Sequence, residues 1–576
     1  MTIAVRSPRA GGHAAPSRAA GGVRGDFSAA LIVLAAVPLA FLQIPDLIAA
    51  AEPTMLASVA SGSRYGNAVI RAAGLALPAM LLAAPAAALG ARRGPGWRVL
   101  TAGLITLGAA DLAASLPATW VETVPGIALD RAVHGLGAGA VLAASLAVVW
   151  ERRAAARRVL ACLWSVAAVS TMTAAVPLIG FRVAVGGWRA ALQPYPWLAG
   201  VALAVTAVHV VVTGGAGATG SGGRRAGGRA TGSGGRGAGG RGGRRDGVTG
   251  GAGGVITPAE RAQLALLFVP AVGLGALAVG STFQWPPSGQ LAAGGVATAM
   301  LTTLAIVLYR DAVVGSVPAL PFCALLTGLA MAPSAGVIEG SRLLRTGAAA
   351  APNPARVLLG VPATHAMTAV GAVPALPIAA AFAGGIIAAA VAAGAARSAL
   401  RPRSDGRRHV PAPNAAAAVG LAVSACGLAL ARATGTLTRA TGTLTRATGT
   451  LTRGAGTLTP AQLQTLALAL LAGGLALALG AAMADASACA ALTVLPLALA
   501  GMVTGYLVAG GMQILFVTAG SRGHRLTAAP PAVSGALLRA TAMWELAAAA
   551  TAGLAAIMVL LAGRARRAGV GSPSSG

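Results

Sequence analysis

Long hydrophobic runs, separated by short polar or glycine-rich stretches, make up most of the chain between residues 27 and 561. A helix that crosses the hydrocarbon core of a bilayer needs about 20 apolar residues. The runs that meet this length predict fourteen transmembrane helices, at residues 27–50, 72–90, 99–118, 127–150, 159–181, 195–212, 264–283, 291–309, 317–338, 367–396, 410–431, 463–483, 488–517 and 533–561. The pattern therefore predicts an all-α integral membrane protein.

The composition excludes a soluble globular protein. Of the 576 residues, 56% are hydrophobic and 10% are charged, and the mean hydropathy is +0.76. Soluble domains carry about 25% charged residues. The first hydrophobic run is longer than the core of a secretory signal peptide and has no convincing cleavage site, so we expect it to remain as the first helix.

Arginine supplies all 43 basic residues, and its distribution predicts the orientation of the chain. Cytoplasmic loops of membrane proteins are enriched in basic residues. With both termini inside, 28 arginines fall on the cytoplasmic side and 13 outside, while Arg131 and Arg539 lie within spans. This predicts a multi-pass protein of the plasma or inner membrane with both termini in the cytoplasm. The net charge of +29 is then accounted for without a nucleic-acid partner.

Polar tracts predict the domain organisation. The expected segments are a disordered basic N-terminus (1–26), a six-helix half (27–213), a cytoplasmic linker (214–254), two linking helices (262–309), a second six-helix half (313–563) and a basic tail (564–576). The Gly/Arg-rich linker lacks large apolar residues and cannot form a core, so we interpret it as a flexible tether in preference to a segment that binds RNA or anionic lipid.

A short internal repeat lies within the second half. Residues 432–459 read RATGTLT three times and then RGAGTLT. One Leu in each seven residues leaves no coiled-coil seam. We therefore expect an expanded external loop.

Ionisable residues inside a span are costly and are candidates for function. At 1.5 Å per residue, Asp46 and Arg131 both lie roughly 28 Å from the inner ends of their helices, and Asp111 lies roughly 18 Å from the inner end of its own. Glu52 lies at the outer mouth, and Glu545, roughly 24 Å from the inner end of the last span, is a third carboxylate candidate. Lipid, protons and a small-molecule substrate are the expected partners.

Two interpretations of these charges stay open. Protonation of Asp46 or Asp111 beside Arg131 would couple proton binding to a rearrangement. Alternatively, Arg131 forms a structural ion pair that keeps the helices in register. His134, on the same helix as Arg131, is either a polar packing residue or a proton carrier. The glycine-rich run at 135–140 favours close helix packing, because a dinucleotide fingerprint would require a preceding strand and an exposed loop.

The chain has no pattern that points to an enzyme. There is no Walker A motif, no zinc-ligand spacing and no nucleophile elbow in a suitable context. The four cysteines show no CxxC spacing. We therefore expect no catalytic site, no metal and no cofactor.

The segment LDRAVHGLGAGA, residues 129–140, resembles the helix-four motif of the major facilitator superfamily. Arg131, Gly135 and Gly137 match that motif, and His134 stands where the family usually has Gln. Residues 176–180 resemble the helix-five antiporter motif, with Pro177 and Gly180 matching. These motifs are similar to those of the fourteen-helix drug:proton antiporters.

This resemblance implies two six-helix halves around a central cavity, two linking helices and alternating access. The implied activity is proton-coupled efflux of small amphipathic compounds, with Pro177 and Gly180 bending and packing helix five. The loop at 90–98 lacks the acidic residue of the family's inner-gate motif. A transporter-like scaffold or sensor without a transport cycle is therefore the alternative, and the oligomeric state is left open.

Overall fold

The protein is described as a computed structural model. The described residues are 16–43, 74–115, 123–221, 265–281, 287–310, 319–330, 413–448, 460–484, 486–521 and most of 545–561, with a few single positions between them. Asp46 and Glu52 lie outside these residues, and Pro177 and Gly180 are described only as positions in a helix.

The regular secondary structure of this part is helical. Its main helices are α1 (Pro16–Leu42), α5 (Ala76–Arg93), α6 (Gly96–Ser115), α7 (Val124–Trp150), α8 (Ala154–Leu192), α9 (Pro194–Ser221), α11 (Phe268–Ser281), α12 (Pro287–Arg310), α16 (Pro413–Thr448), α17 (Pro460–Ala484) and α18 (Ala488–Ser521). Two further apolar helices span Ala319–Ala330 and Glu545–Leu561.

Proline marks the start of many of these helices. α1, α9, α12, α16 and α17 each begin at a proline, because its fixed φ suits the first turn and its missing N–H would have no partner there. In α7, Pro125 follows the N-cap Thr123, whose side chain accepts a hydrogen bond from the Gly126 amide at 3.1 Å. The sequence thus sets these helix starts locally.

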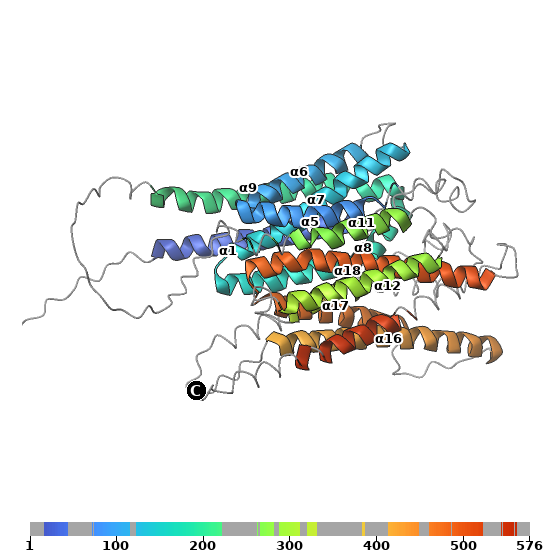
Figure 1. The fold of residues 1–576 in the computed structure, drawn as a ribbon. Helices are drawn as coiled ribbons and strands as arrows, with labels where there is room; N and C mark the ends of the chain where they lie inside the picture. Colours follow the sequence, from blue (N-terminus) through green and yellow to red (C-terminus); the bar gives the residue numbers. More distant parts are fainter. Residues whose placement is uncertain are drawn as a thin grey trace, which may run out of the picture.

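The helices lie side by side in one bundle with their axes along a common direction (Figure 1). α7 packs against α5, α6 and α1, and its residues from Val141 to Trp150 are all buried. α1 also packs against α8 and α9, and α17 packs between α8 and α16. α7 therefore runs through the interior of the bundle, where polar side chains are shielded from lipid.

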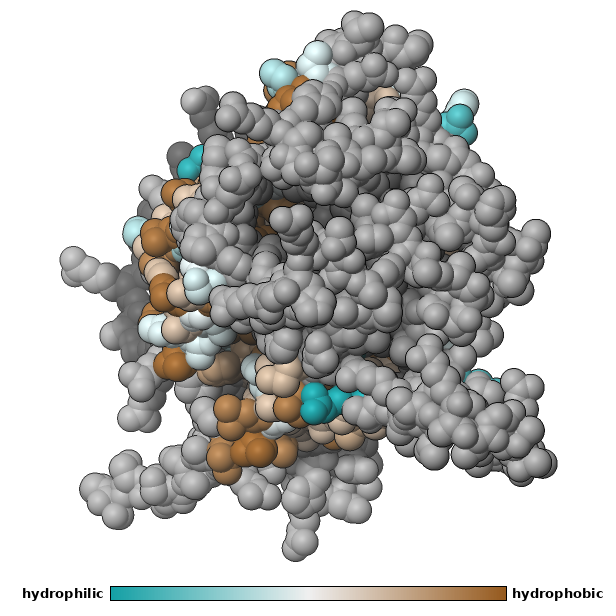
Figure 2. All heavy atoms as spheres, turned by 90° about the vertical axis from the view of Figure 1, so that its right-hand side faces the viewer, coloured by the Kyte–Doolittle hydropathy of each residue, from teal (hydrophilic) through white to brown (hydrophobic). Residues whose placement is uncertain are grey.

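Eight helices of the described part are long and apolar enough to cross a bilayer, which makes the chain a multi-pass membrane protein by length and composition. On the outer face of α9, Trp197, Val201, Val208 and Val211 are exposed. Figure 2 shows hydrophobic residues gathered along one edge of the visible face. The total of fourteen spans stays a prediction, because the predicted span at 367–396 lies almost wholly outside the described residues.

Several predicted boundaries are wrong. α1 begins at Pro16, inside the segment expected to be disordered, and α9 continues to Ser221, into the expected linker. α8 has 39 residues and ends at Leu192, so it includes most of the expected loop after residue 181. No proline occurs between residues 178 and 192, and Pro194 then restricts the residue before it and ends the run.

The expectation of a loop across the RATGTLT repeats is also wrong for residues 432–448, because α16 continues to Thr448. These residues contain no proline. Once α16 is nucleated by its alanine-rich first turns, each added residue gains one backbone hydrogen bond. The absence of a coiled-coil seam therefore does not prevent a single helix.

Glycines in α7 set the distance between α7 and its neighbours. A Cβ on Gly139 would lie 2.6 Å from the carbonyl oxygen of Met80 in α5, and one on Gly135 would meet the carbonyl of Ala76. A Cβ on Gly137 would lie 2.7 Å from Leu107 Cγ in α6. This agrees with the packing interpretation of residues 135–140, since only glycine lets these backbones approach so closely.

Candidate functional site

A buried polar cluster joins α1, α6 and α7. Asp111 of α6 and His134 of α7 are both 3% exposed. The Nε2 atom of His134 lies 3.0 Å from Oδ1 of Asp111. Gln43, which directly follows α1, donates from Nε2 to the other carboxylate oxygen of Asp111 at 2.8 Å. One carboxylate thus links the residue after α1 to α6 and α7.

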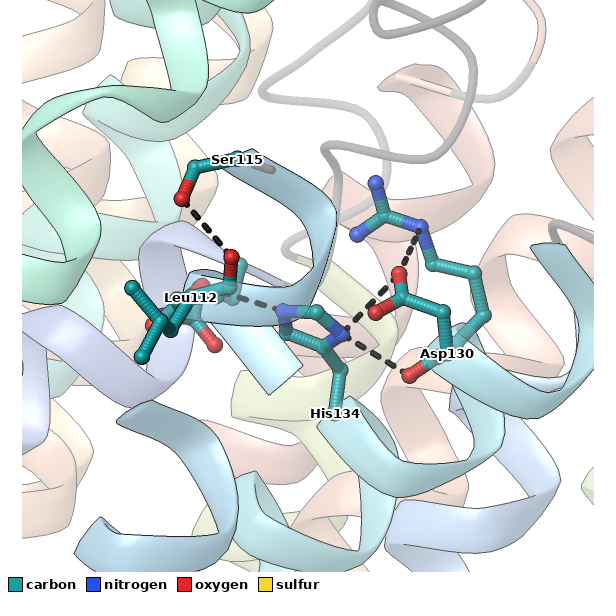
Figure 3. Close-up of polar contacts among 7 residues, drawn as sticks. Leu112, Ser115, Asp130 and His134 are labelled. Carbon is teal, nitrogen blue, oxygen red and sulfur yellow. Dashed lines mark hydrogen bonds and ion pairs between the residues drawn. The ribbon is translucent and has the colours of Figure 1, made fainter. Parts of the chain in front are cut away.

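The second side of the cluster is built within α7. Asp130 and His134 are one helical turn apart, so their side chains lie on the same face. His134 Nδ1 lies 2.8 Å from the carbonyl oxygen of Asp130 and 3.3 Å from its Oδ2. Arg131 Nε lies 3.8 Å from the same Oδ2. Figure 3 shows the imidazole of His134 with Asp130 beside it.

The geometry requires one proton between Asp111 and His134. A carbonyl oxygen only accepts hydrogen bonds, so Nδ1 of His134 carries a hydrogen and donates it to Asp130. Nε2 then either donates to an ionised Asp111 or accepts from a protonated one. Without that proton, an imidazole lone pair and a carboxylate oxygen would face each other at 3.0 Å. One proton between these two atoms would therefore satisfy the contact.

The cluster differs from the predicted one in its pairing. We expected Asp111 or Asp46 to pair with Arg131. Among the described residues, Arg131 contacts the adjacent Asp130, and Asp46 lies outside these residues, so its pairing stays a prediction. Asp111 pairs with His134 instead. His134 therefore lies at the centre of the cluster, and both interpretations of its role, packing residue and proton carrier, stay open.

Sequence reasoning missed one member and left another without a role. Gln43 is an uncharged residue at the end of a hydrophobic run, and nothing in the sequence marked it. Asp130 was visible as a neighbour of Arg131, and its spacing of four from His134 was the available signal. Glu545 is 5% exposed in the helix that spans Glu545–Leu561.

A second polar group lies where α7 ends and α8 begins. Glu151, the C-cap of α7, accepts a hydrogen bond from the Gly96 amide at 2.8 Å. Arg152 donates from Nη2 to Nε2 of His209 in α9 at 3.0 Å, and Nδ1 of His209 lies 2.8 Å from Ser28 Oγ in α1. This group therefore connects the start of α6 to the end of α7, and the residue after α7 to α9 and α1.

Burial raises the pKa of Glu151 above its usual value of 4.5, against the opposing effects of the Gly96 amide and Arg152. The folded state thus holds the Glu151 proton more tightly than the unfolded chain does. The contribution of Glu151 to stability is largest below pH 4.5 and falls as pH rises through the raised pKa.

We therefore expect the melting temperature of the wild type, relative to Glu151→Gln, to fall by a few degrees as pH rises above 4.5. The glutamine keeps an oxygen that accepts from Gly96 and does not titrate. Thermal unfolding of both proteins in detergent across this pH range measures the difference. A difference that is constant with pH, or one that grows in favour of the wild type, would contradict the prediction.

No group of three or more His, Cys, Asp or Glu side chains suited to hold a metal ion occurs among the described residues.

No protein-family model and no curated protein matches the chain. Among solved structures, it is similar to a peptide transporter POT in complex with sulfate, at 14% identity over 93% of this chain and 94% of that one, with a TM-score of 0.48. It is also similar to the human organic anion transporter MFSD10 (TETRAN), at 12% identity over 93% and 99%, with a TM-score of 0.47.

A third similar structure is a bacterial homolog to the human lysosomal transporter Spinster, in an inward-facing and unoccupied conformation. The identity is 15% over 96% of this chain and 98% of that one, with a TM-score of 0.41. Identities and TM-scores at this level do not place the chain in a family.

Proposed function

We propose that the chain is a secondary transporter of the major facilitator type, which exchanges protons for small amphipathic compounds by alternating access. The helix-four motif at 129–140 supports this proposal, because it supplies Arg131, His134 and the packing glycines from one segment. The proposed location is the plasma or inner membrane, with both termini in the cytoplasm. We infer transport rather than catalysis.

The proton shared by Asp111 and His134 carries the proposal. When His134 carries this proton, the negative charges of Asp111 and Asp130 balance the positive charges of Arg131 and His134. The four side chains then carry no net charge. Loss of the proton leaves one net negative charge among buried residues, where an unbalanced charge is costly. The carboxylate would then also face the imidazole lone pair. Proton release should therefore favour a different arrangement of α6 and α7.

Each residue of the cluster has a proposed role. Asp111 and His134 hold the proton, Asp130 orients the imidazole, and Arg131 balances the charge. Gln43 connects the protonation of Asp111 to α1 through its hydrogen bond.

The candidates outside this cluster keep their proposed roles. Asp46, Glu52 and Glu545 remain candidates for proton coupling. Pro177 and Gly180 are proposed to bend and pack α8, the helix in which they lie.

Everted membrane vesicles with an acidic interior test the function. We expect a panel of fluorescent amphipathic dyes to accumulate in these vesicles, and an ionophore that collapses the pH gradient should abolish the uptake. Vesicles without the protein are the control. A correctly folded protein that moves no dye under any gradient would contradict transport and favour the scaffold or sensor.

A further inference from the structure

One hydrogen bond connects the end of α7 to the turn between α17 and α18, 336 residues later in the chain. Trp150 is the last residue of α7 and is 4% exposed. Its indole N–H donates to the carbonyl oxygen of Ala486 at 3.1 Å. The bond joins the predicted N-terminal half to the predicted C-terminal half. A buried tryptophan at this position differs from the interfacial tryptophan that a helix end usually carries.

The acceptor is held in a defined position. The Ala486 amide donates to the Met483 carbonyl at 3.1 Å, which closes the end of α17. Ser487 caps α18, and its Oγ accepts from the Ala490 amide at 3.1 Å. Because the turn is fixed on both sides, the Ala486 carbonyl can accept the bond from Trp150 without a further loss of conformational freedom in the turn.

Two more contacts continue the same junction along α8 and α17. Ser165 Oγ donates to Met483 Sδ at 3.5 Å. A Cβ built on Gly480 would lie 3.3 Å from Cα and 3.7 Å from Cβ of Cys162. We call this junction the seam, and we define it by Trp150, Cys162 and Ser165 on one side and by Gly480, Met483 and Ala486 on the other.

The seam borders a cavity of about 30 Å³. Met483 belongs to both, and Trp164, next to Ser165, also lines the cavity. The other lining residues are apolar or small, apart from Thr327. Opening of the seam would therefore enlarge this apolar space toward the end of the bundle that carries Arg152.

The two residues after Trp150 connect its hydrogen bond to other helices of the predicted N-terminal half. Glu151 accepts from Gly96 at the start of α6, and Arg152 donates to His209 of α9. A displacement of Trp150 would therefore also displace α6 and α9, together with α7.

We propose that the indole N–H of Trp150, bound to the Ala486 carbonyl, holds the two halves together and closes the bundle at this end. The proposal rests on the proposed function only where dye uptake is measured. In this proposal an uncharged hydrogen bond closes the bundle. This is consistent with the loop at 90–98, which has no acidic residue that could form a charged contact instead. Trp150 is a positioning residue, because it acts on the seam and not on a substrate.

Labelling of Cys162 tests the bond with a matched control. In a background with Cys323→Ala, Cys426→Ala and Cys489→Ala, a membrane-permeant maleimide can report on Cys162, which is 2% exposed in the seam. Trp150→Phe removes the cross-half bond. Trp164→Phe removes the same ring volume and an indole bond of similar length, 3.0 Å, but that bond goes to Ser145 in α7.

We expect Trp150→Phe to raise the labelling rate of Cys162 by about 2- to 10-fold, the range for one net hydrogen bond, and Trp164→Phe to leave it unchanged. Equal rates in the two variants, whether both raised or both unchanged, would overturn the proposal.

A disulfide gives an independent measure of closure. Cβ atoms in disulfides lie about 3.5–4.5 Å apart, so Gly480→Cys should cross-link to the native Cys162 when copper-phenanthroline is added as the oxidant. The cross-link should stop dye uptake, and a reductant should restore it. Gly480→Ala controls for the added Cβ, and Gly480→Cys combined with Cys162→Ala controls for the thiol.

Failure to cross-link, or a cross-link that leaves dye uptake unchanged, would overturn the proposal. If wild-type vesicles take up no dye, the proposed function fails. Labelling and cross-linking of Cys162 would still report on the seam in that case, so the two failures can be distinguished.

Discussion

Asp111→Asn is expected to remove the pH dependence of dye uptake while the protein still folds. The amide group can donate to Nε2 of His134 and accept from Gln43, so both hydrogen bonds of Asp111 have replacements. It cannot hold the shared proton. We expect gradient-driven uptake in everted vesicles to fall by about 5- to 150-fold, the range that corresponds to loss of an ordinary coupling free energy between two sites.

Asp130→Asn is the matched control for this prediction. It removes a carboxylate from the same cluster, but the backbone carbonyl that accepts from Nδ1 of His134 remains. Uptake by Asp130→Asn should keep a dependence on the pH gradient, because Asp111 and His134 can still share a proton, but its pH midpoint should shift, since the change removes one negative charge from the cluster. Dye exchange without a gradient should persist in Asp111→Asn, which separates a loss of coupling from a loss of folding. Wild-type gradient dependence in Asp111→Asn would remove the Asp111–His134 pair from the mechanism.

Gly139→Ala is expected to destabilise the bundle although alanine favours helices. The new Cβ would lie 2.6 Å from the Met80 carbonyl oxygen and 3.1 Å from the Ala84 amide nitrogen, and backbone atoms cannot rotate away. Separation of α5 from α7 should cost about 1–3 kcal/mol, as overpacking in a dense core does. Thermal unfolding in detergent should therefore show a lower melting temperature than the wild type.

Gly200→Ala provides the comparison. Gly200 lies in the exposed face of α9, and a Cβ there would meet nothing within 4 Å. This change should keep or slightly raise the melting temperature, because alanine in a helix is favoured over glycine by about 1 kcal/mol. A Gly139→Ala protein as stable as Gly200→Ala would show that α5 and α7 are not in close contact.

The helices themselves could be predicted from the sequence, because each spanning segment must satisfy its backbone polar groups by hydrogen bonds within the segment. Each of the eleven main described helices overlaps a predicted run, and five of them begin at a proline. The boundaries were less predictable. The end of α8 and the helical repeats of α16 depend on propagation from an existing helix, which a search for apolar runs does not detect.

The pairing of Asp111 with His134 depended on where α6 begins. α6 begins at Gly96, three residues before the predicted start, and the Gly96 amide is bound to Glu151 at the end of α7. Measured from this bond, Asp111 and His134 are fifteen and seventeen residues along their helices, so they lie at nearly the same depth. Depths estimated from the hydrophobic runs alone had placed Asp111 well below Arg131.

The sequence by itself determined that this is a helical membrane protein and that charged residues of α6 and α7 are costly inside it, because both follow from hydrophobic length and charge. Only the tertiary structure decided that Asp111 meets His134, that Gln43 joins them and that Trp150 reaches Ala486. These contacts depend on how each helix is rotated and how far it slides against its neighbours. Packing across the bundle fixes both quantities, and no single segment contains that information.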